Sequence, residues 1–115
     1  MKDKLFIYVN SMTKMHQSFQ TTVGRATGLF LERETITFTD FRGEQHSLSK
    51  LIGLAGEQRM KHLYVYQAEI LSPNLHQAER LIKHFRDYGV EMYFGTDIIP
   101  KGDERFEHII NQKYY

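Results

Sequence analysis

The histidines of this sequence are residues that could bind a metal or act in catalysis. The chain of 115 residues has six histidines and no cysteine, which excludes thiolate zinc sites and disulfides. None of the histidines stands in an HExxH pattern or in another recognised ligand spacing. His76 and His84 fall with Arg80 on the polar side of an expected helix, which is typical of solvated side chains. We therefore predict no metal site and no cofactor.

Serine and carboxylate side chains follow several of the predicted strands. Ser11 comes after the first strand, whereas Asp40 and Glu69 follow two others. A nucleophilic serine needs a base within hydrogen-bond reach, and no serine here stands in a GxSxG setting. Asp40 and Glu69 could form a carboxylate pair, although an acid at such a place commonly accepts hydrogen bonds from backbone donors. We interpret Ser11 as a helix cap and predict no catalytic residue, with an enzyme that uses Ser11, Asp40 and Glu69 as the alternative.

Phosphate binding is the third chemistry that the sequence could support. Neither GxGxxG nor GxxxxGK[ST] occurs, so a nucleotide loop is not expected. A helix beginning near Ser11 would still present free N–H groups, and Lys14, Arg25 and Arg42 could contact phosphates. The 15 basic and 14 acidic side chains are interspersed and give a net charge of +1, which does not favour a general nucleic-acid binder.

The first half of the chain predicts two strands and one long helix. Residues 5–9 form a continuous run of apolar, aromatic and β-branched residues, typical of a central strand covered on both faces. Residues 35–39 alternate Ile36 and Phe38 with threonines, which favours an edge strand. Between them lies a helical stripe, weakened by two glycines in its second half. The stripe consists of Met12, Met15, Phe19, Val23 and Ala26.

The second half repeats the alternation of helix and strand. Residues 47–55 and 75–88 have helical apolar spacing, and residues 62–66 and 90–94 predict strands. A short segment at 103–113, with Asp103 as its cap, has one apolar side. Alternating strands and helices predict an α/β domain with three layers (α/β/α) and a mostly parallel sheet of four to five strands. We expect residues 1–115 to form this single domain. No apolar run is long enough to span a membrane, so we expect a cytoplasmic protein.

In this order the residues resemble the catalytic domain of the serine recombinases, the resolvase and invertase family. Residues 5–13 are similar to that family's first strand and its Y-x-R-V-S-T motif, and Phe38-Thr39-Asp40 to the end of its second strand. Residues 45–52 resemble R-P/E-x-L-x-x-L-L, and residues 65–74 resemble the strand and turn written L-D-R-L-x-R. The match covers about residues 4 to 105. It implies the strand order 2-1-3-4.

The resemblance also shows which residues replace the family's cleavage machinery. The family cuts DNA with a serine whose hydroxyl attacks a phosphodiester, while arginines neutralise the developing phosphate charge. Here the serine position is Met12, and the arginine positions are Asn10, Gln45, Ile70 and Pro73. None of these side chains can replace a hydroxyl or a guanidinium. Thr13, Asp40 and Glu69 stand where the family has Thr, Asp and Asp, which suits a retained scaffold better than a retained reaction.

The resemblance therefore predicts a catalytically inactive domain with a protein-binding or regulatory role. Such a domain would pair with itself or with an active recombinase, through the helix near residues 103–113 and the neighbouring sheet edge. The alternative is a small nucleic-acid-binding protein that uses the crevice at the strand C-terminal ends with Lys14, Arg25 and Arg42. Such binding would weaken steeply with salt. No membrane partner and no small-molecule cofactor is expected.

Overall fold

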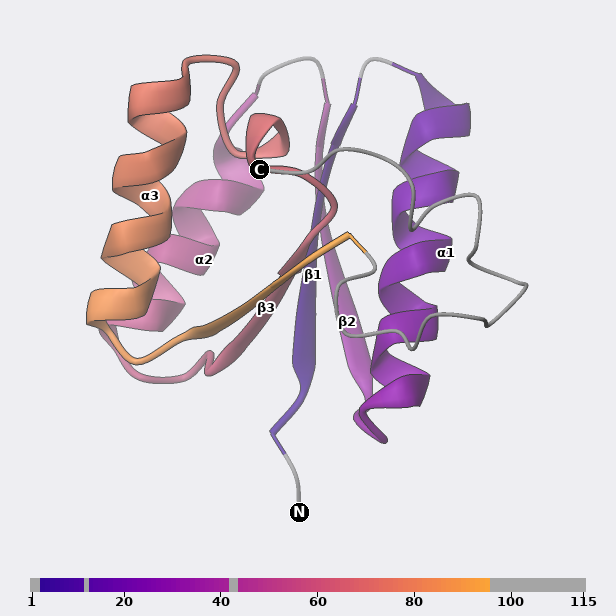
Figure 1. The fold of residues 1–115 in the computed structure, drawn as a ribbon, viewed down its shortest axis with the longest axis horizontal. Helices are drawn as coiled ribbons and strands as arrows, with labels where there is room; N and C mark the ends of the chain where they lie inside the picture. Colours follow the sequence, from indigo (N-terminus) through magenta and orange to yellow (C-terminus); the bar gives the residue numbers. More distant parts are fainter. Residues whose placement is uncertain (1–2, 12, 42–43, 96–115) are drawn as a thin grey trace.

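The computed structural model describes residues 3–11, 13–41 and 44–95. They form a three-layer α/β/α fold around four parallel strands in the order β2-β1-β3-β4, which confirms the predicted fold and strand order (Figure 1). The predicted helix at 103–113 lies outside the described residues. In chain order the elements are β1 (Leu5–Ser11), α1 (Lys14–Phe30), β2 (Thr35–Phe41), α2 (His46–Gly56), β3 (His62–Val65), the 3-10 helix η1 (Ala68–Ile70), α3 (Leu75–Asp87) and β4 (Glu91–Phe94).

Strand β1 is central, as its continuous apolar run predicts. It pairs with β2 on one side and β3 on the other, so that Phe6 aligns with both Ile36 and Leu63. Successive side chains of a strand point to opposite faces, and both faces of β1 are covered by helices. Ile7 and Val9 pack toward α1, whereas Tyr8 packs toward α2 and α3. Figure 1 shows α1 on one side of the sheet and the other two helices on the opposite side.

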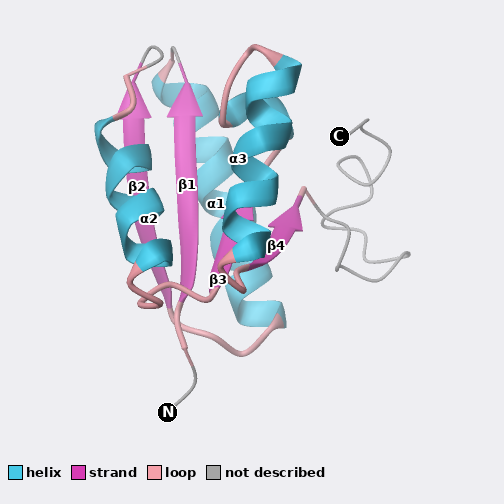
Figure 2. Ribbon diagram, turned by 90° about the vertical axis from the view of Figure 1, so that its left-hand side faces the viewer, coloured by secondary structure: helices cyan, strands magenta, loops and turns pink. Residues whose placement is uncertain are grey.

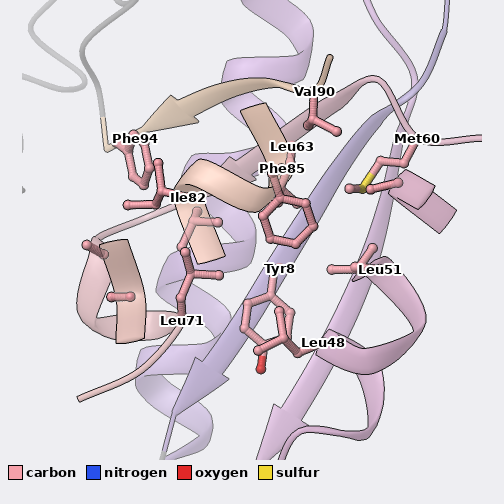
Figure 3. Close-up of a cluster of buried hydrophobic side chains, with 14 residues drawn as sticks. Tyr8, Leu48, Leu51, Met60, Leu63, Leu71, Ile82, Phe85, Val90 and Phe94 are labelled. Carbon is pink, nitrogen blue, oxygen red and sulfur yellow. The ribbon is translucent and has the colours of Figure 1, made fainter. Parts of the chain in front are cut away.

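The larger core lies between the sheet and the pair α2 and α3. Tyr8 and Phe85 are fully buried in it, and Figure 3 shows both side chains in the cluster between the sheet and the helices. Helix α2 contributes Leu48 and Leu51, and α3 contributes Ile82. The apolar spacing of residues 47–55 and 75–88 therefore marks real buried faces. Each fully buried aliphatic or aromatic side chain of this kind contributes roughly 1.5–3 kcal/mol.

Helix α1 packs on the sheet through small residues, which differs from the stripe that the sequence predicts. Met15 is 78% exposed and does not belong to the buried face, whereas Val23 is buried and Phe19 packs beside it, as predicted. The buried face consists of Gln20, Val23, Gly24, Thr27 and Gly28. A Cβ added at Gly24 would lie 2.8 Å from Ile7 Cγ2, and one at Gly28 would overlap the Thr35 methyl group. The two glycines lower helix propensity, but they allow α1 to approach the sheet closely.

The start of α1 also differs from the prediction. Ser11 belongs to β1, and the N-cap of α1 is Thr13, whose hydroxyl accepts a hydrogen bond from the His16 amide at 3.2 Å. The strand continues two residues beyond the predicted 5–9 because Asn10 and Ser11 remain paired with β2. No helix in the described part of the chain has both the length and the apolar character needed to cross a membrane.

Candidate functional site

The strand-end pocket is an open hollow of about 420 Å³ at the carboxyl ends of β1 and β3. Helix α1, which connects β1 to β2, covers one face of the sheet, and helix α2, which connects β2 to β3, covers the other. The connections therefore change from one face of the sheet to the other between β1 and β3. Ligands of open parallel sheets bind at such a switch point. The strand-end pocket is therefore the position at which this fold would hold a ligand. Its lining residues are Asn10, Ser11, His16, Phe19, Gln20, Tyr66, Gln67 and Ile70.

Gln20 fixes the wall of the strand-end pocket. Its side-chain oxygen accepts a hydrogen bond from the Asn10 amide at 3.3 Å, and its side-chain nitrogen donates to the Asn10 carbonyl at 3.3 Å. The side chain is only 5% exposed, so a buried carboxamide joins α1 to the end of β1. Phe19 and Tyr66 meet edge to face with ring centroids 5.3 Å apart and close the apolar side. Gln20 was not predicted from the sequence, although a polar residue three positions before Val23 on the apolar side of the helix was an available signal.

Ser11 lines the strand-end pocket, but its contacts are those of a turn residue. Its hydroxyl oxygen accepts a hydrogen bond from the Thr13 amide at 3.2 Å, and its carbonyl accepts one from the Gln17 side chain at 3.3 Å. Within the described residues, no hydrogen bond joins the Ser11 hydroxyl to an imidazole or a carboxylate. Activation of a serine requires such a base. In this geometry Ser11 closes the turn into α1.

Asp40 lies on the opposite face of the sheet and is only 4% exposed. One carboxylate oxygen accepts hydrogen bonds from the Tyr8 hydroxyl at 2.7 Å and the Leu48 amide at 3.0 Å, and the other accepts one from the Ser47 amide at 2.8 Å. The two amides belong to the first turn of α2, so Asp40 caps that helix from a neighbouring strand. Gln45, the N-cap residue itself, makes no side-chain capping bond.

The ionisation of this cluster follows from its contacts. Burial alone would raise the pKa of Asp40, but the hydrogen bonds from the Ser47 amide, the Tyr8 hydroxyl and the Leu48 amide together lower it below its ordinary value. Burial, and then the hydrogen bond to the Asp40 carboxylate, raise the pKa of Tyr8. Asp40 is therefore a charged structural acceptor. Glu69 is exposed on η1, and the structure does not bring it together with Asp40 as a carboxylate pair.

Uncharged side chains stand at the positions where the recombinase resemblance expects arginines, and each of them lies in a different environment. The Asn10 side chain donates to the Tyr8 hydroxyl at 3.2 Å and to the Glu44 carbonyl at 3.3 Å, which connects the Asp40 cluster to the end of β1. Ile70 lines the strand-end pocket, and Pro73 is exposed before α3. Met12 lies outside the described residues. Of the predicted positions, only Asn10 and Ile70 meet at the strand-end pocket.

The three basic residues of the nucleic-acid hypothesis do not meet at the strand ends. Lys14 is exposed at the start of α1, and Arg25 is three helical turns away, about 16 Å along the axis. Arg25 instead lines a second hollow, beside Leu29 and Thr35 near the start of β2. Arg42 lies outside the described residues. Nucleic-acid binding therefore stays a prediction.

The histidines lie in different environments rather than in one cluster. In the part of the chain that the structure describes, no three histidine, aspartate or glutamate side chains gather as a metal site. His76 is exposed, as expected. His84 is not fully solvated: it is half-buried, its Nε2 atom is buried without a hydrogen-bond partner among the described residues, and its ring lies 4.9 Å from that of Tyr88. The polar side of α3 is therefore partly closed by aromatic packing.

His62 makes the fold sensitive to mild acid. Its Nδ1 atom lies 3.2 Å from the Tyr93 hydroxyl and 3.7 Å from Glu91. Burial, and then the positive charge of Arg33, lower the pKa of His62 below 6.5. The unfolded chain therefore takes up a proton before the folded chain does, and stability falls as the pH decreases through about 6.5. We expect His62→Gln to reduce this pH dependence in denaturant unfolding, and His76→Gln, at an exposed position, is the matched substitution for comparison. An unaltered slope in His62→Gln would contradict the assignment.

No protein-family model matches this sequence, and no match to it is found among the curated proteins.

Proposed function

We propose that this chain is a catalytically inactive, serine-recombinase-like domain that acts by binding another protein. The observation that carries the proposal is that hydrogen bonds within the fold already occupy the polar side chains at the strand ends. The Asp40 carboxylate is occupied by three donors of the fold, and the Ser11 hydroxyl accepts a backbone amide. The strand-end pocket, to which Ser11 belongs, is lined by amide, hydroxyl, imidazole, aromatic and aliphatic groups.

That lining does not suit phosphoryl transfer. The transition state spreads negative charge over the phosphoryl oxygens, and catalysis depends on cations placed against that charge. Among the described residues of the lining, none is an arginine or a lysine, and His16 is the one titratable side chain that is basic. The substitutions that the recombinase resemblance predicts at Asn10 and Ile70 account for this neutrality. Their side chains cannot hold or neutralise a phosphodiester.

A protein-binding role is supported by the distribution of exposed apolar side chains. Apolar side chains that gather on a surface mark sites of association. Several large ones on this domain are exposed by more than a third, two of them at the end of α1 and two on β2. They are Met15, Leu29, Phe30, Ile36, Phe41, Leu75 and Tyr88. The partner that suits a recombinase-like fold is a recombinase subunit, which this domain would inhibit or tune by occupying one subunit position.

The test combines a cleavage assay with a binding assay. Incubation of the purified chain with supercoiled plasmid should give no nicking and no covalent protein–DNA product, and Ser11→Ala should behave in the same way. Addition of the chain to a purified, active serine recombinase should give mixed oligomers by native mass spectrometry and a falling recombination rate. Nicking that is lost in Ser11→Ala would overturn the inactivity. A recombinase that forms no mixed oligomer and keeps its rate would overturn the choice of partner.

A further inference from the structure

The outer edge of β2 has unpaired backbone groups. Strand β2 is the edge of the sheet, with β1 on its inner side only (Figure 2). The Glu34 carbonyl accepts a hydrogen bond from the Leu5 amide at 2.8 Å, so the backbone groups of even-numbered residues point to β1. Those of Thr35, Thr37 and Thr39 therefore point outward. Of these, the Thr39 carbonyl accepts the Ser47 hydroxyl at 2.8 Å, and the others make no hydrogen bond among the described residues.

This edge lacks the features that usually prevent strands from pairing. Sheet edges are normally protected by lysine, proline, bulges or short length. Strand β2 has the sequence TITFTDF, pairs with β1 over seven consecutive residues without a bulge, and contains neither lysine nor proline. Its one charged residue, Asp40, is buried against α2. By contrast, the other edge strand, β4, has four residues. The open edge of β2 is therefore a template for another strand.

The pattern of β2 is complementary to itself. The five residues Thr35 to Thr39 alternate threonine and apolar side chains symmetrically about Thr37. In an antiparallel pair centred on Thr37, each Thr35 would oppose a Thr39 on one face, and each Ile36 would oppose a Phe38 on the other. Threonine pairs and apolar pairs both stabilise opposing strands. The register also places the outward backbone groups in hydrogen-bonded pairs. A second copy of this strand therefore satisfies both its backbone and its side chains.

The surroundings of the edge fit the same register. Phe41 is 37% exposed and shares its face of the strand with Thr35 and Thr37, the face that carries α1. Antiparallel pairing about Thr37 would place it opposite Arg33 of the second copy. Arg33 and Thr35 line the hollow near the start of β2, together with Leu29, which is 81% exposed. The hollow has a volume of about 530 Å³.

The charges at this hollow do not repel a second copy. Two arginines and two glutamates line it, so its formal charge is balanced. At the other end of the edge, the Glu44 amide donates to the Phe41 carbonyl at 3.1 Å, and the Glu44 carboxylate lies 4.0 Å from His46 Nε2. The antiparallel arrangement would place this carboxylate near Arg33 of the second copy, and symmetry would repeat the contact. Attraction between the Glu44 carboxylate and Arg33 of the second copy would favour the antiparallel direction.

We propose that two copies of this chain associate through their β2 edges, antiparallel and with Thr37 on the two-fold axis, to form one continuous sheet. The inference rests on the proposed protein-binding role and deepens it by naming a surface and a partner. The surface lies at the opposite edge of the sheet from β4, after which the segment 103–113 follows in the chain. Each Phe41 side chain would enter the hollow beside Leu29 of the other copy.

A charge exchange at position 37 tests this register. We expect light scattering to show a dimer for the wild-type chain, and monomers for Thr37→Lys and Thr37→Glu, because identical charges would meet on the two-fold axis. An equal mixture of the two variants should restore the dimer mass. Circular dichroism that matches the wild type would show that both variants fold, since the Thr37 backbone groups point away from β1. A wild-type monomer at every concentration would overturn the inference, as would a mixture that remains monomeric.

A cross-linking experiment provides an independent measurement. The chain has no cysteine, so a single introduced thiol can form only intermolecular disulfides. Thr37→Cys should give a covalent dimer under mild oxidation, because opposing residues of hydrogen-bonded strands lie within disulfide range. Ser49→Cys, at an exposed position on α2, should cross-link far more slowly and is the matched control. Equal rates would overturn the inference. Mixed oligomers with a recombinase would, in that case, still uphold the proposed function.

Discussion

Asp40→Ala is expected to lower the free energy of unfolding by about 3 kcal/mol. The substitution leaves the Tyr8 hydroxyl and the amides of Ser47 and Leu48 without their acceptor. The hydroxyl is fully buried between the sheet and α2, so water cannot replace the carboxylate there. The first turn of α2 also loses its cap. Guanidinium denaturation followed by circular dichroism measures the change.

Two further variants separate this effect from a loss of charge. Asp87→Ala removes an exposed carboxylate that is 3.0 Å from Lys83 on α3, and it should change stability by no more than about 0.5 kcal/mol. Tyr8→Phe removes one of the three donors while Asp40 keeps both amides, so its cost should lie between the other two. An Asp40→Ala protein as stable as Asp87→Ala would show that the cap contributes nothing.

Gly28→Ala is expected to destabilise the fold by about 2 kcal/mol, although alanine is the better helix former. The new methyl group would overlap the Thr35 side chain and lie 3.2 Å from the Arg33 carbonyl oxygen. The Arg33 backbone cannot move freely, because its amide donates to the Gly28 carbonyl at 2.8 Å. Relief of the overlap therefore requires α1 to move away from the sheet. The midpoint of denaturant unfolding measures the effect.

Gly53→Ala is the matched control on α2. No atom lies within 4 Å of a Cβ built at this position, so only the gain in helix propensity remains. We expect a stabilisation of up to about 1 kcal/mol. The same substitution should thus have opposite signs on the two helices. If Gly28→Ala stabilised the protein as Gly53→Ala does, this result would show that α1 does not pack closely on β2.

The fold was predictable because the apolar patterns are strong at the elements that organise it. The continuous run in β1 fixes the central strand, and the alternation in residues 35–39 fixes the edge. The stripe predicted on α1 was right at Val23 and Phe19 but wrong at Met15, and it missed the small side chains that pack against the sheet. Periodicity of large apolar residues cannot detect a stripe that includes Gly24 and Gly28. Met15, which completed the predicted stripe, is exposed instead.

The candidate site was predictable in place but not in detail. The carboxyl ends of parallel strands locate it, and Asn10, Ser11 and Ile70 do line the strand-end pocket. The bond of Asp40 to Tyr8 and the double contact of Gln20 with Asn10 depend on which face each side chain takes and on how closely α1 approaches. The sequence contains no spacing rule for such contacts. They join residues on separate elements.

The central position of β1 has a consequence for how this protein folds during its synthesis on the ribosome. Strand β1 is made first, but its second edge is paired only after β3, which includes Leu63, has been made. Most of the domain has been synthesised by then. Until that moment β1, α1 and β2 can form only a half-sheet, whose Tyr8 and Phe38 side lacks the cover of α2 and α3. Contacts so distant in sequence slow folding. Until α2 and α3 have been made, the nascent chain therefore exposes an apolar face, to which chaperones or a neighbouring nascent copy on the same messenger RNA can bind.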